Sequence, residues 1–308
     1  MSNNLFSYDT EIYNRNFLNC AQRQSIVMLK RDGVPVDWLF YTTQVSTDRI
    51  RDFSLIEQKP KFDFEYDGLT DDDFKVIGVD RKNHYLDSFV EAKPQLLDVI
   101  ARDGFVLMSC NLIHVPHRPE YYNKRDVLHF QTLTGYNPLE AIWDAVDDNS
   151  AAILAYFTFD EAFLEKIYNA SLLKGYRSFA ITRRSPADIG DDVEVLFQGH
   201  RKNRCDSLHL LQDIEGYIVA EPDRLKMLAE AFSLLSGSRI CFAQFLRLAD
   251  VASVWIDLAV EIGREAARIR DAFTMWQVGG KVSVEKIRQR ARAIADLEAR
   301  LSELRSLS

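Results

Sequence analysis

"NFLNCAQRQSIVMLKRDG", residues 16–33, places a cysteine at the start of a predicted helix. Asn19 is a good helix N-cap, Cys20 follows it as the first helical residue, and Gly33 provides the stop. The middle of the segment, SIVML, is apolar on every side, so we expect the helix to be buried. The unpaired N–H groups and the dipole of a helix start favour a thiolate. Cys20 is therefore a candidate nucleophile as well as a candidate core residue.

The composition is typical of a globular protein and excludes several classes of partner. The 308 residues are 47% hydrophobic and 27% charged, with a net charge of −8. This charge argues against a nucleic-acid partner, and no apolar run is long enough to span a membrane. The start, MSNNLFSYDTE, lacks the blocks of a signal peptide, and the four cysteines form no C-x-x-C pair. A reduced, cytoplasmic protein without a metal site is expected.

The first 165 residues alternate helical and strand-like patterns. A helix is predicted over 93–104, followed by strands over 105–115, 127–135 and 140–146, with short turns between the last two. FTFDEAFLEKIYNASLL, residues 157–173, is predicted to be helical, and the acidic stretch over 65–80 to be solvated surface. The pattern indicates an α+β layout with antiparallel strands.

A connector is predicted over residues 166–205. It contains EVLFQG at 194–199, which matches the core of a picornaviral 3C-type protease recognition site that is often engineered into expressed proteins. Either a cleavage site stands in a loop, or a natural strand resembles one by accident. No native function follows from it.

Residues 206–308 are predicted to form a helical bundle. A helix over 223–236 ends at a glycine, and residues 250–276 carry apolar positions in alternating steps of three and four. The last helix repeats apolar residues every seven positions. The Gly279-Gly280 turn predicts an antiparallel hairpin of the last two helices, packed against helix 223–236 or against a second copy in a homodimer.

A thiolate nucleophile needs a base and a group that orients that base. His129 lies between Leu128 and Phe130 in a predicted strand, an expensive place for a histidine that only fills space. Asp144 and Asp147 lie on the next strand, and a strand pair brings His129 close to one of them. The residues alone leave both aspartates open.

Other patterns are less specific. His114 and His117 resemble a metal pair, but no third ligand is close in the sequence. Tyr121 and Tyr122 are interpreted either as lining the active-site cleft and binding substrate, or as packing against a strand edge. The absence of a glycine-rich phosphate loop argues against a nucleotide-dependent ligase.

Three segments resemble the butirosin-biosynthesis (BtrH-like) acyltransferase family, whose N-terminal domain is papain-like and related to the C39 peptidases. They are NFLNCAQRQSIVMLKRDGVPVDWLFY, VPHRPEYYNKRDVLHFQTLTGYN and AVDDNSAAILAYFTFDEAF. The likeness covers most of residues 10–165 and is weaker over the helical half. It implies a papain-like catalytic domain over 1–165 and a helical domain over 206–308.

The resemblance also implies roles for individual residues. Cys20 matches the nucleophile, His129 the base, and Asp147 the orienting acid, because Asp147 keeps the family-like distance to FTFDEAF. This chain departs from the family pattern where Asp148 takes the place of a proline, so Asp144 stays an alternative acid.

The oxyanion hole implied by the resemblance combines the backbone N–H of Cys20 with a side-chain amide upstream. Asn14 and Asn16 are the candidates for that amide.

The activity implied by the resemblance is thiol-dependent acyl transfer or thioester hydrolysis in natural-product biosynthesis. An acyl or aminoacyl group would leave the phosphopantetheine of an acyl or peptidyl carrier protein and pass through an acyl-cysteine to a small-molecule amine or to water. No metal or redox cofactor is implied. A C39-like cysteine peptidase or amidohydrolase, and a non-catalytic scaffold of the same fold, are the alternatives. Arg288, Arg290, Arg292 and Arg300 are interpreted as a surface for docking an acidic carrier protein.

Overall fold

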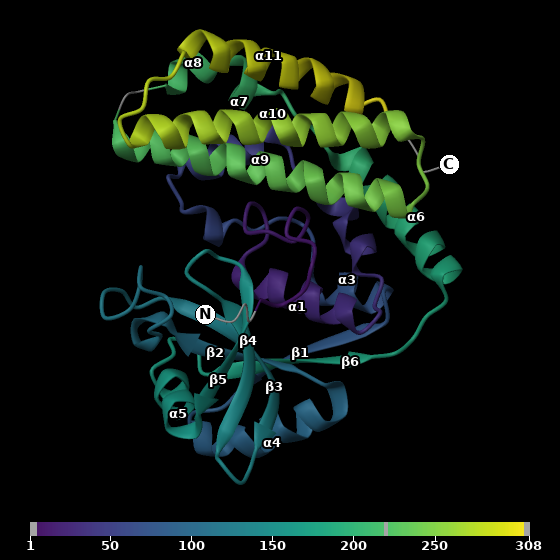
Figure 1. Ribbon diagram of the computed structural model, residues 1–308. Coiled ribbons are helices and arrows are strands. Elements are labelled where there is room, and N and C mark those ends of the chain that lie inside the picture. Colours follow the sequence, from purple (N-terminus) through teal and green to yellow (C-terminus); the bar gives the residue numbers. More distant parts are fainter. Residues whose placement is uncertain (1–4, 219–220, 305–308) are drawn as a thin grey trace. The chain divides into compact units, whose positions relative to one another are not determined.

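The computed structural model describes residues 5–218 and 221–304; residues 1–4, 219–220 and 305–308 lie outside the described residues. The chain divides into two units, each built from separate segments. The sheet unit is the described part of Met1–Tyr13, Cys20–Val34 and Asp71–Arg183; the helical unit is the described part of Asn14–Asn19, Pro35–Thr70 and Arg184–Ser308. The predicted α+β class and helical C-terminal region are confirmed (Figure 1). The predicted domain limits at 165 and 205 stay predictions.

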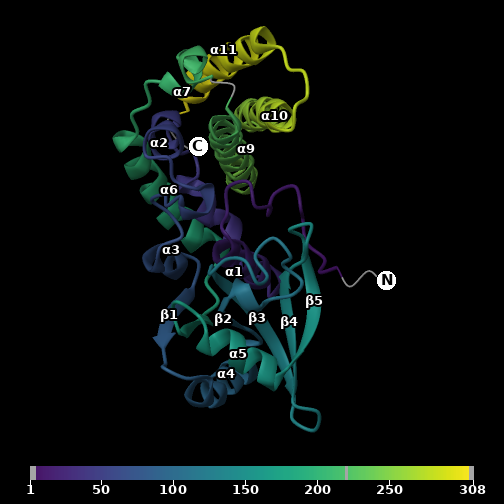
Figure 2. The same cartoon turned by 90° about the vertical axis from the view of Figure 1, so that its left-hand side faces the viewer.

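The sheet unit contains one six-stranded sheet that is antiparallel throughout. Its order is β1-β6-β2-β3-β4-β5, and Figure 2 shows β2 to β5 in that sequence across the sheet. The strands are β1 (Val79–Tyr85), β2 (Val106–Asn111), β3 (Leu128–Asn137), β4 (Ile142–Asp148), β5 (Leu154–Asp160) and β6 (Gly175–Ile181). The predicted strands at 105–115, 127–135 and 140–146 correspond to β2, β3 and β4.

Helices cover this sheet and complete its core. They are α1 (Cys20–Arg31), α3 (Asp71–Val76), α4 (Phe89–Asp103), α5 (Glu161–Asn169) and the short 3₁₀ helix η4 (Leu112–His114). Leu96 of α4 and Ile167 of α5 are fully buried in one cluster with Trp143 of β4. Helix α1 contacts β2 and β3. It begins at Cys20 as predicted, and Gly33 has the positive φ of 81° that suits a helix stop.

Two expectations about this unit were wrong. Residues 157–160 of the predicted helix belong to β5, and the helix begins only at Glu161, where the Asp160 side chain accepts from the Phe163 N–H and caps it. The acidic stretch over 65–80 is not plain surface, because it holds α3, with the buried Phe74, and the start of β1. Strand β1 pairs with β6, nearly a hundred residues later, so no local pattern announces it.

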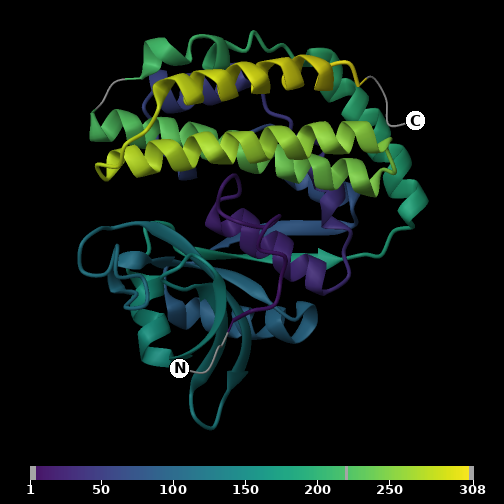
Figure 3. The ribbon, with the colours of Figure 1, turned by 45° about the horizontal axis from the view of Figure 1, so that its top comes forward.

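The helical unit is dominated by three long helices, coloured green to yellow in Figure 3. Helix α10 packs against both α9 and α11. The elements are η1 (Val36–Thr42), α2 (Thr47–Arg51), η2 (Asp52–Ile56), η3 (Lys61–Asp63), α6 (Pro186–Asn203), α7 (His209–Gln212), α8 (Ile214–Tyr217), α9 (Pro222–Leu248), α10 (Ser253–Gln277) and α11 (Val284–Leu301). No helix in the described ranges is long and apolar enough to cross a membrane. The homodimer stays a prediction.

Helix α9 continues through Gly237, where the sequence predicted its end. A Cβ atom at this position would lie 2.7 Å from the backbone nitrogen of Phe17 and 2.9 Å from the Cβ of Asn16. The glycine therefore serves a close approach of the 14–19 segment to the helix, and it is not a stop signal.

The EVLFQG sequence lies in helix α6, so its expected place in a loop or strand was wrong. Ser185 caps this helix by accepting from the N–H of Asp188, and Pro186 occupies its first turn. Val193 and Phe197, four residues apart, are buried, and the Phe197 ring packs against Phe242 and Phe245 of α9. An apolar stripe with helical spacing overrides the local strand pattern.

Candidate active site

The candidate site lies in the sheet unit and begins with Cys20 at the first position of α1. The residue is partly exposed, and its side chain is hydrogen-bonded to His129. Cys110 and Cys241 are fully buried, and burial raises the pKa of both thiols. A partly exposed cysteine at a helix start, in contact with a histidine, has the surroundings that a reactive thiolate requires.

The sheet register brings His129 of β3 to Asp147 of β4. Thr132 pairs with Val146, so Asp147 lies across from Gln131, two positions along β3 from His129. Side chains in this diagonal relation lie on one face of the sheet and can reach each other. His129 donates from Nε2 to Oδ1 of Asp147 over 2.6 Å.

Both members of this pair are buried and hold each other charged. Burial alone would lower the pKa of His129, but the charges of Asp147 and the Cys20 thiolate raise it from 6.5 to about 9. Burial would likewise raise the pKa of Asp147, but the charge of His129 and hydrogen bonds from His117 and His129 hold it well below its usual range. The arrangement favours an imidazolium beside a carboxylate at neutral pH.

Two side chains of α1 fix the helix that carries Cys20. Gln24, one turn further along, donates to the carbonyl oxygen of Phe130 over 2.7 Å and accepts from the Thr132 hydroxyl over 2.7 Å. The adjacent Arg23 is fully buried and forms an ion pair with Asp148 at the end of β4. The helix is thereby joined to the strand of His129 and to the strand of Asp147.

The loop between η4 and β3 is joined to the same end of β4 through two consecutive residues. His117 donates from Nε2 to Oδ2 of Asp147 over 2.9 Å. Arg118 lies with its Nη1 3.5 Å from Oδ2 of Asp148, and both side chains are almost completely buried. Asp148, which stands where the resembling family has a proline, thus serves as the anion between Arg23 and Arg118.

The other predicted acid, Asp144, lies elsewhere on β4. It pairs with Gly135 in the strand register and its side chain is exposed. The carboxylate that meets His129 is therefore that of Asp147.

The two candidate oxyanion donors lie in the helical unit. The side-chain oxygen of Asn14 accepts from the N–H of Asn16 over 2.8 Å. The side-chain oxygen of Asn16 lies 3.0 Å from Nη1 of Arg270 and 3.3 Å from the hydroxyl of Ser233. An oxyanion role would need an amide nitrogen of one of them, and it stays a prediction.

The tyrosines of the loop divide between core and surface. Tyr121 packs against the sheet core and lies under the guanidinium of Arg118, 5.4 Å from ring centroid to Cζ. Tyr122 is 38% exposed. Their predicted role in substrate binding stays a prediction. His117, considered with His114 as a metal pair, instead meets Asp147, and no group of three or more potential ligands that could hold a metal ion occurs among the described residues.

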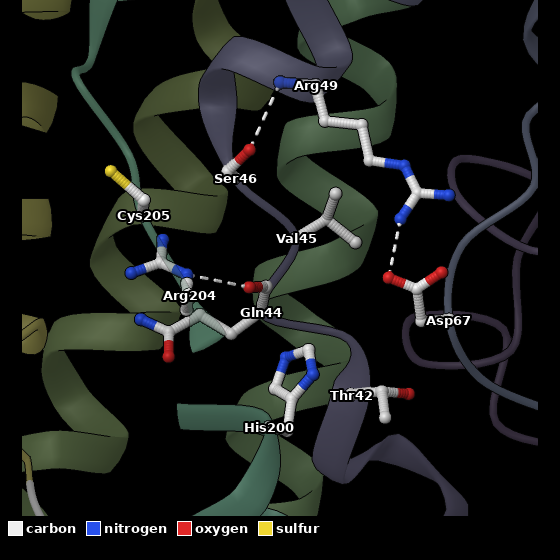
Figure 4. Close-up of a pocket in the computed structure, with 9 residues that line it drawn as sticks. All are labelled: Thr42, Gln44, Val45, Ser46, Arg49, Asp67, His200, Arg204 and Cys205. Atoms are coloured by element: carbon white, nitrogen blue, oxygen red, sulfur yellow. Dashed lines mark hydrogen bonds and ion pairs between the residues drawn. The ribbon is translucent and has the colours of Figure 1, made fainter. Parts of the chain in front are cut away.

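A separate cavity of about 190 Å³ in the helical unit offers a different cysteine and histidine, Cys205 and His200 (Figure 4). Figure 4 shows Arg204 and Gln44 between the sulfur and the imidazole. Arg204 donates to the Gln44 carbonyl oxygen over 3.0 Å. The two side chains do not form a nucleophile–base pair, so this cavity does not compete with the site at Cys20.

Sequence reasoning missed the side chains that support the site. Gln24 follows Cys20 by four residues and therefore lies on the same helix face, which is a signal that could have identified it. His117 directly follows Val115-Pro116, but it was considered only as a metal ligand with His114, which the sequence did not favour, and not as a partner of Asp147. Arg23 and Arg118 gave no signal, because a buried arginine is recognised only when its partner, Asp148, is known.

Comparison with known proteins gives one relevant similarity. No family model matches the chain. The chain is 24% identical, over 293 residues, to a protein of Niallia circulans named ribostamycin:4-(gamma-L-glutamylamino)-(S)-2-hydroxybutanoyl-[BtrI acyl-carrier protein] 4-(gamma-L-glutamylamino)-(S)-2-hydroxybutanoate transferase. The match covers 90% of this chain and 93% of the relative. The similarity therefore extends beyond residues 10–165 into the helical half.

Proposed function

We propose that this chain, a distant homologue of that acyl-carrier-protein-dependent transferase over almost its full length, transfers an acyl group from a carrier-protein thioester through Cys20. The observation that supports this most directly is the hydrogen-bonded series Cys20–His129–Asp147. A nucleophile, a base in contact with it, and a carboxylate on the far nitrogen of the base are the parts of a thiol-dependent acyl-transfer site.

A papain-like catalytic arrangement is part of the proposal. In such sites the cysteine opens a helix, while the histidine and its acid come from a neighbouring sheet. Here Cys20 opens α1, and the other two residues lie on the antiparallel strands β3 and β4. The anchoring of α1 to these strands through Gln24 and Arg23 supports the same reading.

In the first half-reaction the Cys20 thiolate attacks the carbonyl carbon of the carrier-bound thioester. The tetrahedral intermediate breaks the bond to the phosphopantetheine sulfur, which takes a proton from His129 and leaves as a thiol. The products are the acyl-Cys20 enzyme and a neutral His129. Asp147 keeps the remaining proton of His129 on Nε2, so that the unprotonated Nδ1 is the nitrogen that faces Cys20.

In the second half-reaction His129 acts as a base, and its pKa changes in the direction that this role requires. The Cys20 charge is one cause of the raised pKa of His129, and acylation removes that charge. The pKa of His129 therefore falls once the acyl-enzyme has formed, and the neutral imidazole accepts a proton from the attacking amine. The amide forms, the Cys20 thiolate leaves, and the ion pair is restored.

The test is intact-protein mass spectrometry after incubation with a panel of synthetic acyl thioesters. We expect a mass increase equal to one acyl group, located on Cys20 by peptide mapping and discharged by an added amine. Cleavage of peptides without reaction of thioesters would instead favour the C39-like peptidase. No reaction with either, together with unchanged carrier binding by Cys20→Ser, would indicate a scaffold.

The rate of Cys20 acylation should fall as the pH rises through about 9. The pKa of His129 is raised from 6.5 to about 9, so the imidazolium that protonates the leaving sulfur persists up to that pH and is lost above it. The measurement is the rate of acyl-enzyme formation from a small thioester between pH 6 and 10. A rate that keeps rising from pH 9 to pH 10 would contradict the role of His129 as the acid.

The carrier protein also needs a docking surface, and we propose a groove between α10 and α11. Its volume is about 490 Å³, its apolar lining includes Ile269, Met275 and Ile287, and its charged lining is mainly basic. The basic residues are Arg268, Lys281, Lys286 and Arg290. In a chain with a net charge of −8, a basic rim around an apolar floor fits an acidic amphipathic helix of a carrier protein.

Of the four arginines proposed from the sequence, Arg288 and Arg290 are less available than these lysines, whereas Arg292 and Arg300 are exposed but lie outside the groove. Arg288 forms ion pairs with Glu215 and Glu285, and Arg290 forms one with Glu265. Within residues 5–218 and 221–304, neither Lys281 nor Lys286 forms a salt bridge. The two lysines are therefore the cations that a carrier would meet first.

Reversing both lysine charges in Lys281→Glu/Lys286→Glu should raise the apparent KM for a carrier-bound substrate by roughly tenfold at low salt. A small thioester that lacks the carrier should react unchanged. Arg292→Glu/Arg300→Glu is the matched control, since it reverses two exposed charges of α11 outside the groove. An equal rise in KM for both double variants would place the docking surface elsewhere.

A further inference from the structure

Asp147 serves two histidines, one on each carboxylate oxygen. Oδ1 accepts from Nε2 of His129 over 2.6 Å, and Oδ2 accepts from Nε2 of His117 over 2.9 Å. The N–H of Asp148 donates to Oδ1 over 2.7 Å, while the Gln131 amide lies at 3.3 Å from Oδ2. The donor on Oδ2 with the shorter contact is therefore His117, which the acyl-transfer mechanism does not use.

The position of His117 is fixed independently of Asp147. Its ring stacks on Phe157 of β5, with centroids 4.1 Å apart and planes at 24°. The next residue, Arg118, ties the loop to Asp148, and only 16% of the His117 side chain is exposed. A histidine that served only for packing would not need an N–H directed at the Asp147 carboxylate on β4.

We infer that His117 is a positioning residue for the acyl transfer proposed above: it holds the Asp147 carboxylate so that the other oxygen stays aligned with His129. A carboxylate with a strong donor on each oxygen cannot turn about its Cβ–Cγ bond without breaking one of the two bonds. The hydrogen bond from His117 is stronger to the ionised than to the protonated acid, so it lowers the pKa of Asp147 and helps to keep it charged beside His129. This inference rests on the proposed function, but it makes a separate claim about Asp147.

Two substitutions separate hydrogen bonding from packing. His117→Phe keeps an aromatic ring for Phe157 and loses the N–H, whereas His117→Gln keeps an N–H at nearly the place of Nε2 and loses the ring. We expect His117→Phe to lower the rate of Cys20 acylation by a small thioester about 10- to 100-fold with little change in KM, by analogy with the loss seen when the hydrogen-bond partner that orients a metal ligand is removed. His117→Gln should recover most of that loss.

A second readout needs no thioester. The rate of Cys20 alkylation by iodoacetamide, followed by peptide mapping so that Cys205 does not contribute, reports the thiolate content at each pH. His117→Phe should displace the midpoint of this profile to higher pH, because a poorly held Asp147 stabilises the His129 imidazolium less. His117→Gln should resemble the unmodified protein.

The outcomes distinguish this inference from the proposed function. If the protein forms no acyl adduct, the function fails, but the displaced alkylation profile of His117→Phe would still support the role of His117. If His117→Phe keeps both the acylation rate and the alkylation profile, the inference is overturned. It is also overturned if His117→Gln loses as much as His117→Phe, because a restored N–H toward Asp147 would then fail to recover the rate.

Discussion

The Cys20→Ala protein should form no acyl adduct and should transfer an acyl group at a rate lower by at least about 10⁴-fold. Removing the nucleophile of a triad has effects of this order or larger, because the acyl-enzyme route is then closed. Cys20→Ser should be nearly as inactive, since a hydroxyl is far harder than a thiol to ionise beside His129. The measurements are intact mass after incubation with an acyl thioester and the release of free carrier thiol.

The folding of the Cys20 variants should be unaffected, so a loss of acylation can be attributed to the missing thiol. Cys20 is only partly buried and stands at the first residue of α1, whose attachment to the sheet depends on Gln24 and Arg23. Cys205→Ala is the matched control, because Cys205 is exposed in the helical unit. An acyl adduct that persists in Cys20→Ala and disappears in Cys205→Ala would show that Cys205, and not Cys20, is the nucleophile.

Local sequence patterns predicted the helices and strands that are marked by residues within the element itself or at its ends. Helix α1 and the strands β2, β3 and β4 have caps, glycine stops or alternating residues that can be read directly. Strand β1 could not be found this way, because it is defined by pairing with β6 and Val79 is its one fully buried residue. The predicted helix end at Gly237 was wrong for a related reason. The glycine is needed because the 14–19 segment, distant in sequence, approaches the helix closely there.

The part of the candidate site that could be predicted is the part that residue types and a family resemblance identify. Cys20 and His129 stand out by position and chemistry, but the choice between Asp144 and Asp147 depends on the strand register. Asp144 lies opposite Gly135, whereas Asp147 lies two positions diagonally from His129. A single-residue difference in alignment turns a strand residue to the other face of the sheet, so sequence spacing alone could not decide this.

Apart from Gln24, the side chains that support the site could not be predicted, because they form long-range polar contacts in a buried region. His117 and Arg118 are consecutive in a loop, and Asp147 and Asp148 are consecutive at the end of a strand. The structure joins them pairwise, so that one aspartate serves the histidines and the other serves the arginines. A buried charge is stable only beside its partners, and those partners are known only from the fold.

The two neighbouring aspartates should therefore respond in opposite ways to the same substitution. Asp148 lies between Arg23 and Arg118 with all three side chains almost fully buried. Asp148→Asn removes the buried anion beside Arg23 and leaves Arg118 with the partly exposed Glu120, and we expect it to lower the free energy of unfolding by about 3–5 kcal/mol. The fraction that remains folded should still acylate Cys20. Urea denaturation and the acylation rate per folded molecule measure the two effects separately.

Asp147→Asn should instead leave the fold intact and slow the acylation of Cys20 by up to about 10⁴-fold. Asparagine has the same shape, but it carries no charge to stabilise the His129 imidazolium. Its amide can also donate to Nε2, which would place the imidazole proton on the nitrogen facing Cys20, where it cannot accept the thiol proton. Asp144→Asn, an exposed control on the same strand, should react at the unchanged rate. A large loss in Asp144→Asn together with full activity in Asp147→Asn would show that the contact with His129 is structural and that the acid lies elsewhere.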